Sequence, residues 1–413
     1  MGEAVGRTMR IGRPRAIGAA AVAAAALLSF PAAATAAGGW PQYGWNARHT
    51  FANASESAIT PGTVARLRAG WARTIAPDGL LAATPTVAGG RVFVVVQGGP
   101  LVALDARSGA RLWSVDGAVV GQPAVEGERV LACVDGVLHA YGVRGGAPGF
   151  TAGRCSGAPA VDGARGFSAA GRLIAWSTAD GRRLWRSPTS IALLDQTPTV
   201  GYGRVFAGGA GPDNRNIYVF DEATGGMRSV RSAGAGCLAG TPAFLCGYRV
   251  MSGSSLVAGN LWFVRFLWCG ACADVDGSAS LRALAVTSWA RPPASEAIRR
   301  GWDEISQYWD PATPPPVAGD QHVFAPMLDG GESAYRLVSA AAEWQTDAVP
   351  GTMNATLVPG LAFFDTCGCA VATATGRVLW SSGEPWAAAA PAVAGGVVYW
   401  PQGGTLRTYR LPG

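Results

Sequence analysis

The chain has 413 residues and a formal net charge of +6, and 49% of its residues are hydrophobic but only 15% charged. Its 33 basic residues are all arginine, and the lack of lysine excludes Schiff-base and phosphate-loop chemistry. Four of these arginines and one glutamate lie in residues 1–36, so the remainder carries +3. No basic stripe remains, which excludes nucleic acid as an expected partner.

Residues 1–36 have the features of a secretory signal peptide. Arginines from Arg7 to Arg15 precede an alanine-rich apolar run over residues 16–30, and Ala34, Thr35 and Ala36 offer small residues for cleavage. The alternative is a retained membrane anchor, which the alanine content and Pro31 argue against. We therefore expect residues 37–413 to be secreted, with no stable membrane span.

A sequence motif then recurs eight times along the chain. It consists of an apolar strand ending near a valine, a glycine turn and a second apolar strand. Residues 84–93 give the clearest copy. The equivalent valines are Val87, Val125, Val161, Val200, Val257, Val317, Val358 and Val393. A repeat near 40 residues is typical of stacked supersecondary units, and wider spacings after Val200 and Val257 indicate insertions in the fourth and fifth units.

The first unit predicts four short strands over residues 84–87, 91–96, 101–106 and 111–115. The last unit supplies three strands, and residues 67–74 are expected to complete it as the outer strand. The predicted fold is all-β, an eight-bladed β-propeller of four-stranded antiparallel blades closed by an N-terminal strand in the last blade.

Between the third and fourth strands of the first unit lies Ala-x-Asp-x-x-x-Gly-x-x-x-Trp, ending at Trp113, with echoes at residues 175–185, 219–229 and 370–380. This run resembles the tryptophan-docking motif of the propellers similar to pyrroloquinoline quinone (PQQ) dehydrogenases and to BamB. Residues 40–44 and 60–67 also resemble the start of secreted quinoprotein-like chains. The resemblance implies that four tryptophans lie between neighbouring blades as structural residues: Trp71, Trp113, Trp185 and Trp380.

Eight cysteines in an exported chain favour disulfide bonds. The sequence-local pairing is our hypothesis, since the sequence does not fix connectivity. It joins Cys133 to Cys155, Cys237 to Cys246, Cys269 to Cys272, and Cys367 to Cys369.

Strand direction predicts which face of the propeller carries the long connections. In a four-stranded meander, the connections from second to third strand and from one unit to the next share a face. The long segments 233–254, 267–280 and 290–315, and the cysteines, are all assigned to that face. Loops on a rigid scaffold are where binding usually occurs, so we expect function there.

The segment 302–310 is the richest aromatic and acidic cluster, and its candidate ligand-binding residues are Trp302, Asp303, Tyr308, Trp309 and Asp310. Aromatic rings beside carboxylates suit sugars or other small polar ligands. Residues 293–307 are expected to form a short helix, and the alternative role of that helix is to pack over the channel mouth. Asp274 and Asp276 are candidate metal ligands, against the alternative of a solvated loop.

Family enzymes that oxidise alcohols carry two adjacent cysteines over the cofactor, and this resemblance fails at Cys367-Gly-Cys369 and Cys269-Gly-Ala-Cys272. Ala273 follows Cys272 where a c-type haem requires histidine, so that haem is excluded. We expect a monomeric, non-catalytic module without a cofactor, binding a small molecule, a glycan or an envelope protein. The alternatives are a divergent dehydrogenase that uses PQQ and Ca²⁺ to oxidise alcohols or sugars, and an envelope assembly scaffold similar to BamB.

Overall fold

The computed structural model describes residues 38–81, 83–188, 197–208, 216–232, 355–384 and 389–413, together with shorter segments between 235 and 349. Those segments are 235–236, 247–251, 256–258, 261–269, 278–285, 305–308, 317–319, 321–326, 332–337, 342–346 and 349. The regular elements in these residues are β-strands and one 3-10 turn, η1 (Val64–Arg66). No helix in the described part of the chain is long and apolar enough to span a membrane.

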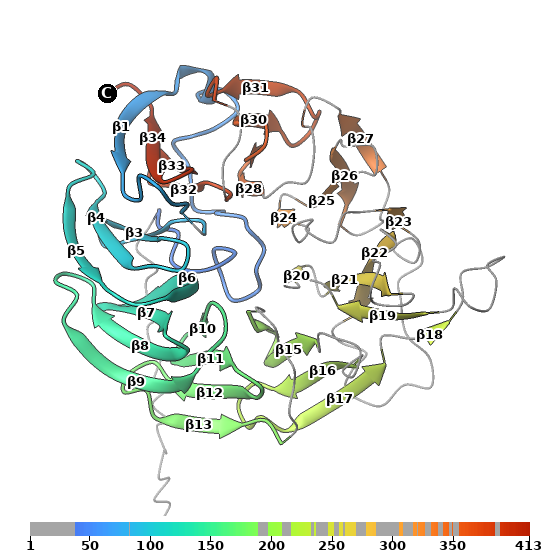
Figure 1. Cartoon of the computed structure of the whole chain (residues 1–413). Helices are drawn as coiled ribbons and strands as arrows, with labels where there is room; N and C mark the ends of the chain where they lie inside the picture. Colours follow the sequence, from blue (N-terminus) through green and yellow to red (C-terminus); the bar gives the residue numbers. More distant parts are fainter. Residues whose placement is uncertain are drawn as a thin grey trace, which may run out of the picture. The chain divides into compact units, whose positions relative to one another are not determined.

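The described strands form eight antiparallel sheets, which we number in chain order (Figure 1). Six of them are meanders in which each strand pairs with the next. Sheet 1 contains β2 (Thr86–Ala88), β3 (Arg91–Val95), β4 (Leu101–Asp105) and β5 (Arg111–Val115). Sheet 2 contains β6 (Val119–Glu126), β7 (Arg129–Val134), β8 (Val137–Gly142) and β9 (Pro148–Arg154). Sheet 3 contains β10 (Ala160–Asp162), β11 (Arg165–Ala169), β12 (Leu173–Ser177) and β13 (Arg183–Arg186). Sheet 4 contains β14 (Thr199–Gly201), β15 (Arg204–Gly208), β16 (Asn216–Asp221) and β17 (Met227–Ser232). Sheet 6 contains β24 (Val317–Gly319), β25 (His322–Pro326), β26 (Glu332–Arg336) and β27 (Ala342–Thr346). Sheet 7 contains β28 (Ala355–Val358), β29 (Leu361–Phe364), β30 (Cys369–Ala372) and β31 (Val378–Ser381).

Sheet 8 joins distant parts of the chain. Its strands are β32 (Ala392–Ala394), β33 (Val397–Gln402), β34 (Thr405–Arg410) and β1 (Arg68–Thr74), and β1 pairs antiparallel with β34. The hydroxyl of Thr408 donates a hydrogen bond of 2.8 Å to the carbonyl oxygen of Trp71. The strand predicted over residues 67–74 is therefore the outer strand of this sheet.

Sheet 5 departs from the meander. It contains β18 (Ala235–Gly236), β19 (Gly247–Met251), β20 (Leu256–Ala258), β21 (Leu261–Cys269), β22 (Ser278–Ala285) and β23 (Ile305–Tyr308). The long strand β21 pairs with β20 near its start and with β19 near its end. Segment 233–254, predicted as a connecting loop, thus contributes two strands to the sheet.

The predicted helix over residues 293–307 is wrong at its end, because Ile305–Tyr308 forms β23 and pairs with β22. Pairing with a neighbouring strand outweighed the local helical spacing of apolar residues, because that spacing carries no information about partners 24 to 30 positions away. The outer strand of sheet 5 consequently follows the insertion.

The core lies between neighbouring sheets, where the apolar side chains of consecutive units meet. Phe93 and Leu101 of sheet 1 are fully buried against Val130 and Ala132 of sheet 2. The β2–β3 turn needs glycine, since Gly89 and Gly90 have φ values of +58° and +72°. Short strands with one apolar face and tight turns therefore stack sheet against sheet.

The first strands of the sheets contact one another, so we call β2, β6, β10, β14, β20, β24, β28 and β32 the inner strands. Contacts follow chain order from β2 to β32, and β32 also contacts β2. These contacts make the fold a β-propeller, with the last strand of each sheet on the outside.

Candidate binding face

A segment that precedes β1, residues 40–56, crosses the inner strands, and we call it the strap (blue in Figure 1). Its main chain hydrogen-bonds to the inner strands of sheets 1, 2, 4, 6 and 7 at 2.7 to 3.0 Å. The bonded pairs are Trp40 with Val87, Pro41 with Val125, Ala47 with Val200, Thr50 with Ala318, and Phe51 with Leu357. One segment thus contacts the inner strands at the valine position of the repeat or beside it.

Two buried side chains of the strap extend this pattern. The amide of Gln42 donates to the carbonyl oxygen of Val161 at 2.9 Å and accepts from the amide of Val161 at 2.8 Å. The amide of Asn53 donates to the carbonyl oxygen of Val393 at 2.8 Å. Sheets 3 and 8 are therefore tied to the strap through side chains that mimic a strand's donors and acceptors.

The strap lies at the end of the inner strands where the short first-to-second turns occur. The carboxylate of Glu56 accepts a hydrogen bond of 3.0 Å from the amide of Gly396 in the β32–β33 turn. The guanidinium of Arg48 lies 4.6 Å above the ring of Tyr202 in the β14–β15 turn. We call this end the strap edge and the opposite end, which carries the second-to-third and inter-sheet connections, the loop edge.

An aromatic cluster fills the middle of the strap. The ring of Tyr43 meets those of His49 and Phe51 edge-on, with centroid distances of 4.9 and 5.1 Å. His49 and Phe51 are buried, and the Nδ1 atom of His49 lies 3.2 Å from the hydroxyl of Thr199. The strap is therefore a packed structural layer at the strap edge.

The predicted docking tryptophans occupy the seams between sheets. The indole Nε1 of Trp71, Trp113 and Trp185 donates to a carbonyl oxygen of the next sheet's third-to-fourth turn at 2.9 to 3.1 Å. Trp344, which ends a unit without the Asp and Gly of the docking motif, makes the same bond to the carbonyl oxygen of Thr373 at 2.7 Å. The docking role that the resemblance implied is thus structural at these positions.

Trp380 docks differently from the other three. Its ring packs against those of Tyr409 and Trp400, with centroid distances of 5.0 and 6.2 Å. In sheet 8 the outer strand is β1, so no turn joins β34 to its outer neighbour. Trp380 therefore lacks the carbonyl acceptor that the other sheets provide and uses aromatic packing.

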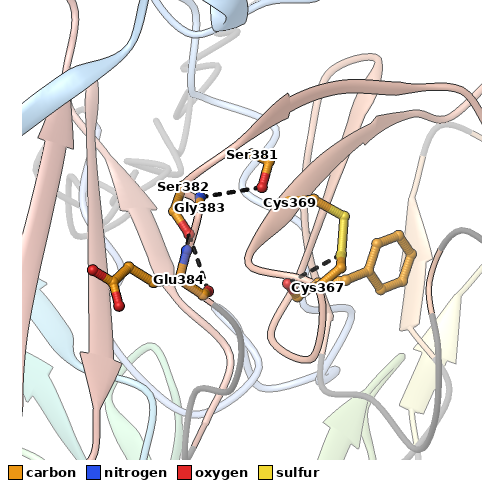
Figure 2. The surroundings of a disulfide bond; sticks show 7 residues. Cys367, Cys369, Ser381, Ser382, Gly383 and Glu384 are labelled. Carbon is orange, nitrogen blue, oxygen red and sulfur yellow. Dashed lines mark hydrogen bonds between the residues drawn. A yellow bond between two sulfur atoms is a disulfide. The ribbon is translucent and has the colours of Figure 1, made fainter.

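Two of the predicted disulfides lie at the loop edge, Cys133–Cys155 and Cys367–Cys369. The first joins the end of β7 to the connection that follows β9, and the second closes the β29–β30 connection (Figure 2). Cys237, Cys246 and Cys272 lie outside the described residues, as does the side chain of Cys269.

Exposed apolar side chains also occur at the loop edge, on either side of the β3–β4 connection. Leu80 is 47% exposed and Val120 is 38% exposed. The amide of Gln97 donates to the carbonyl oxygen of Leu80, and the amide of Val119 donates to that of Gly99. These bonds hold the two flanking segments to one connection and form what we call the Leu80–Val120 surface.

Acidic residues rim this surface. Asp78, Asp116 and Asp135 are all exposed and belong to the segments that flank it. Asp135 also orders the edge, because its carboxylate accepts from the amide of Ala118 at 2.9 Å. An apolar centre with an acidic rim is suited to a partner that carries apolar and basic groups.

The other predicted ligand-binding residues are only partly located. Tyr308 ends β23, the outer edge strand of sheet 5, opposite Ser278. Trp302, Asp303, Trp309 and Asp310 lie outside the described residues, as do Asp274 and Asp276. Groups of three or more potential metal-ligating side chains do not occur in the part of the chain that the structure describes.

The inner strands offer poor chemistry for a bound quinone and its metal. PQQ is an anion and Ca²⁺ takes oxygen ligands, so a site would require arginines and carboxylates. The inner strands with described side chains carry no arginine, and their charged residues are Glu126 and Asp162 at the strap edge. Burial raises the pKa of Glu126, which disfavours the ionised carboxylate that a Ca²⁺ ligand requires. These strands do not fit the cofactor.

A hollow of about 270 Å³ beside β1 and β34 was not foreseen from the sequence. Its lining includes Trp71, Arg107, Tyr399 and Arg410, and burial raises the pKa of Tyr399 to about 12. Positions more than 300 residues apart form it, so no local motif signalled it. It places two guanidinium groups beside aromatic rings at the strap edge.

The chain resembles known proteins in part of its sequence and in its fold. Residues 62–148 and 134–228 match the family described as outer membrane protein assembly factor BamB. No curated protein matches the chain by sequence. Solved structures with the same fold include BamB from Moraxella catarrhalis, at 13% identity and a TM-score of 0.59 over 83% of this chain and 99% of that one.

Two dehydrogenases also share the fold. Quinohemoprotein alcohol dehydrogenase from Comamonas testosteroni is 16% identical, with a TM-score of 0.66 over 93% of this chain and 82% of that one. A europium-containing methanol dehydrogenase is 15% identical, with a TM-score of 0.62 over 89% and 90%. At such identities the likeness shows the fold and no activity. The repeats, the docking tryptophans and these matches together support a PQQ-like β-propeller family for this chain.

Proposed function

We propose that the protein is a secreted, monomeric, eight-bladed closed propeller that acts as a non-catalytic binding module at its loop edge. The contacts that run from β2 to β32 and back to β2 support the blade count and the closure. The observation that carries the function is the contrast between the two edges. The strap and short turns cover one, whereas the other presents the Leu80–Val120 surface beside disulfide-braced connections.

The partner that this surface favours is a protein segment with apolar and basic side chains. A protein partner also agrees with the match of residues 62–228 to the family described as outer membrane protein assembly factor BamB. A small molecule or glycan bound by the 302–310 segment is the other form of the same proposal.

Site-specific photo-crosslinking tests the location of binding. A photoreactive residue placed at Leu80 or Val120 is expected to capture an envelope or extracellular protein from the native host. The matched control is Tyr202, which is 42% exposed at the strap edge. Equal capture from Tyr202, or capture from Tyr202 alone, contradicts binding at the loop edge.

The dehydrogenase alternative has its own test. Purified protein is mixed with PQQ and Ca²⁺, and the mixture is examined for cofactor absorbance and for dye-linked oxidation of alcohols and aldoses. We expect neither stoichiometric binding nor turnover, because the described inner strands lack the arginines that an anionic quinone requires. Tight binding with turnover would replace the binding-module proposal.

A further inference from the structure

The two described disulfides constrain the chain very differently. Cys133–Cys155 spans 22 positions and joins separate segments, whereas Cys367–Cys369 spans two positions within one connection. A cross-link that closes so short a loop removes little freedom from the unfolded chain. Bracing the fold is therefore a weak explanation for Cys367–Cys369.

The connection that contains this bridge, shown beside residues 381–384 in Figure 2, is also held by main-chain hydrogen bonds. The amide of Ser382 donates to the carbonyl oxygen of Gly368 at 2.8 Å, and the amide of Gly368 donates to that of Asp365 at 3.3 Å. Cys369 already belongs to β30, where it pairs with Phe364 of β29. The turn thus has a hydrogen-bonded framework that does not depend on the sulfur–sulfur bond.

Glycine is required between the two cysteines. Gly368 has a φ of +55°, and a Cβ atom there would lie 2.3 Å from the carbonyl oxygen of Glu384. This close approach packs the turn of residues 367–369 against residues 381–384, which follow β31 at the loop edge. The hydroxyl of Ser382 and the main chain of Glu384 hydrogen-bond to each other in this segment.

The two cysteines of this bridge also differ in burial. Cys367 is only partly buried, whereas Cys369 is 2% exposed. Both cysteines of the other bridge are buried, Cys133 at 1% and Cys155 at 3% exposure. Thiol–disulfide exchange needs access to the sulfur that is attacked, and Cys367 is the only one of these four cysteines that is not buried.

We propose that Cys367–Cys369 is a thiol-reactive disulfide that low-molecular-weight thiols reduce while the propeller stays folded. The thiolate of the first thiol attacks Sγ of Cys367, forming a mixed disulfide as the Cys367–Cys369 bond breaks. Cys369 leaves as a thiolate and takes a proton. A second thiol attacks the outer sulfur of the mixed disulfide and releases Cys367, so two thiols become one disulfide and the bridge gains two electrons and two protons.

Reduction would loosen the turn that supports residues 381–384. The consequence is local to the β31 end of the loop edge, because the strands of sheet 7 keep their own pairing. This inference is independent of what the protein binds and of the Leu80–Val120 surface.

The test exposes the folded, fully oxidised protein to dithiothreitol or reduced glutathione and alkylates free thiols at timed intervals. Peptide mapping by mass spectrometry follows each cysteine, while circular dichroism follows the fold. We expect Cys367 and Cys369 to be alkylated at least about tenfold faster than Cys133 and Cys155, with the circular dichroism signal unchanged.

The variant Cys367→Ser/Cys369→Ser is the matched control, and it should oxidise two fewer equivalents of thiol groups in the fast phase. Equal or slower alkylation of Cys367 and Cys369 relative to Cys133 and Cys155 overturns the proposal. Alkylation that proceeds only as the circular dichroism signal is lost overturns it as well.

Discussion

The carboxylate of Glu56 accepts a hydrogen bond from the amide of Gly396, a residue 340 positions later in the chain. Its other oxygen accepts from the amides of Ala58 and Ile59 at 2.8 and 3.2 Å. Glu56 is 3% exposed, so one buried carboxylate fastens the end of the strap to sheet 8.

Replacing this carboxylate should destabilise the fold. In Glu56→Ala three amides lose a charged acceptor, and we expect the free energy of unfolding to fall by about 3 kcal/mol. Chemical denaturation measures the change. The control is Glu128→Ala, which removes only the exposed ion pair with Arg144 and should cost less than about 0.5 kcal/mol. Similar losses in both variants would show that the strap contact is unimportant.

The turn glycines under the docking tryptophans should not tolerate a side chain. In Gly109→Ala the new Cβ atom would lie 2.5 Å from the ring of Trp71, at a φ of +70°. Gly98→Ala is matched, with a φ of +62° but no atom within 4 Å. We expect about 1 kcal/mol of destabilisation in Gly98→Ala and about 2 kcal/mol more in Gly109→Ala.

Thermal unfolding with tryptophan fluorescence reports both variants. If Gly109→Ala is no less stable than Gly98→Ala, the packing of Trp71 on this turn does not contribute to the seam.

Asp221 should contribute to stability in a pH-dependent way. The guanidinium of Arg228 donates to its carboxylate at 2.6 Å and, with Thr224, lowers the pKa of Asp221 to about 2. A pKa lower in the folded than in the unfolded chain gives stability that is present above pH 4 and is lost as the pH falls towards 2. The stability difference between the protein and Asp221→Asn should therefore shrink between pH 5 and pH 2. Denaturant titrations at each pH check this, and a constant difference would contradict it.

The two described bridges should differ in their contribution to stability. Loop-closure entropy predicts about 3 kcal/mol for Cys133–Cys155 and about half of that for Cys367–Cys369. Denaturation of Cys133→Ala/Cys155→Ala and Cys367→Ser/Cys369→Ser measures the two losses. A larger loss in the second variant would mean that the short bridge holds the fold after all.

The repeat predicted most of the local structure, because strand alternation and glycine turns are local signals. In sheet 1 the predicted strand over residues 111–115 matches β5, and the other three boundaries shift by no more than two residues. The sequence pattern also placed Trp71, Trp113 and Trp185 at the seams, since each belongs to a spaced motif or completes a unit.

Longer-range relationships escaped prediction for a physical reason. The strap touches seven inner strands through backbone groups and two amide side chains, and such bonds leave no periodic trace in residues 40–56. At β23 the local signal pointed to a helix, and only pairing with β22 decided the strand. The hollow lined by Arg107 and Arg410 likewise depends on segments that meet only after folding.

The pairing of β1 with β34 constrains the order in which the sheets can form as the chain is synthesised. Residue 68 leaves the ribosome more than 300 residues before its strand partner exists, so the edge of β1 must wait unpaired while seven sheets are synthesised. The strap is also incomplete until late in synthesis, because the hydrogen bond from Asn53 to Val393 needs a residue near β34. Sheet 8 therefore cannot close until β34 has been synthesised.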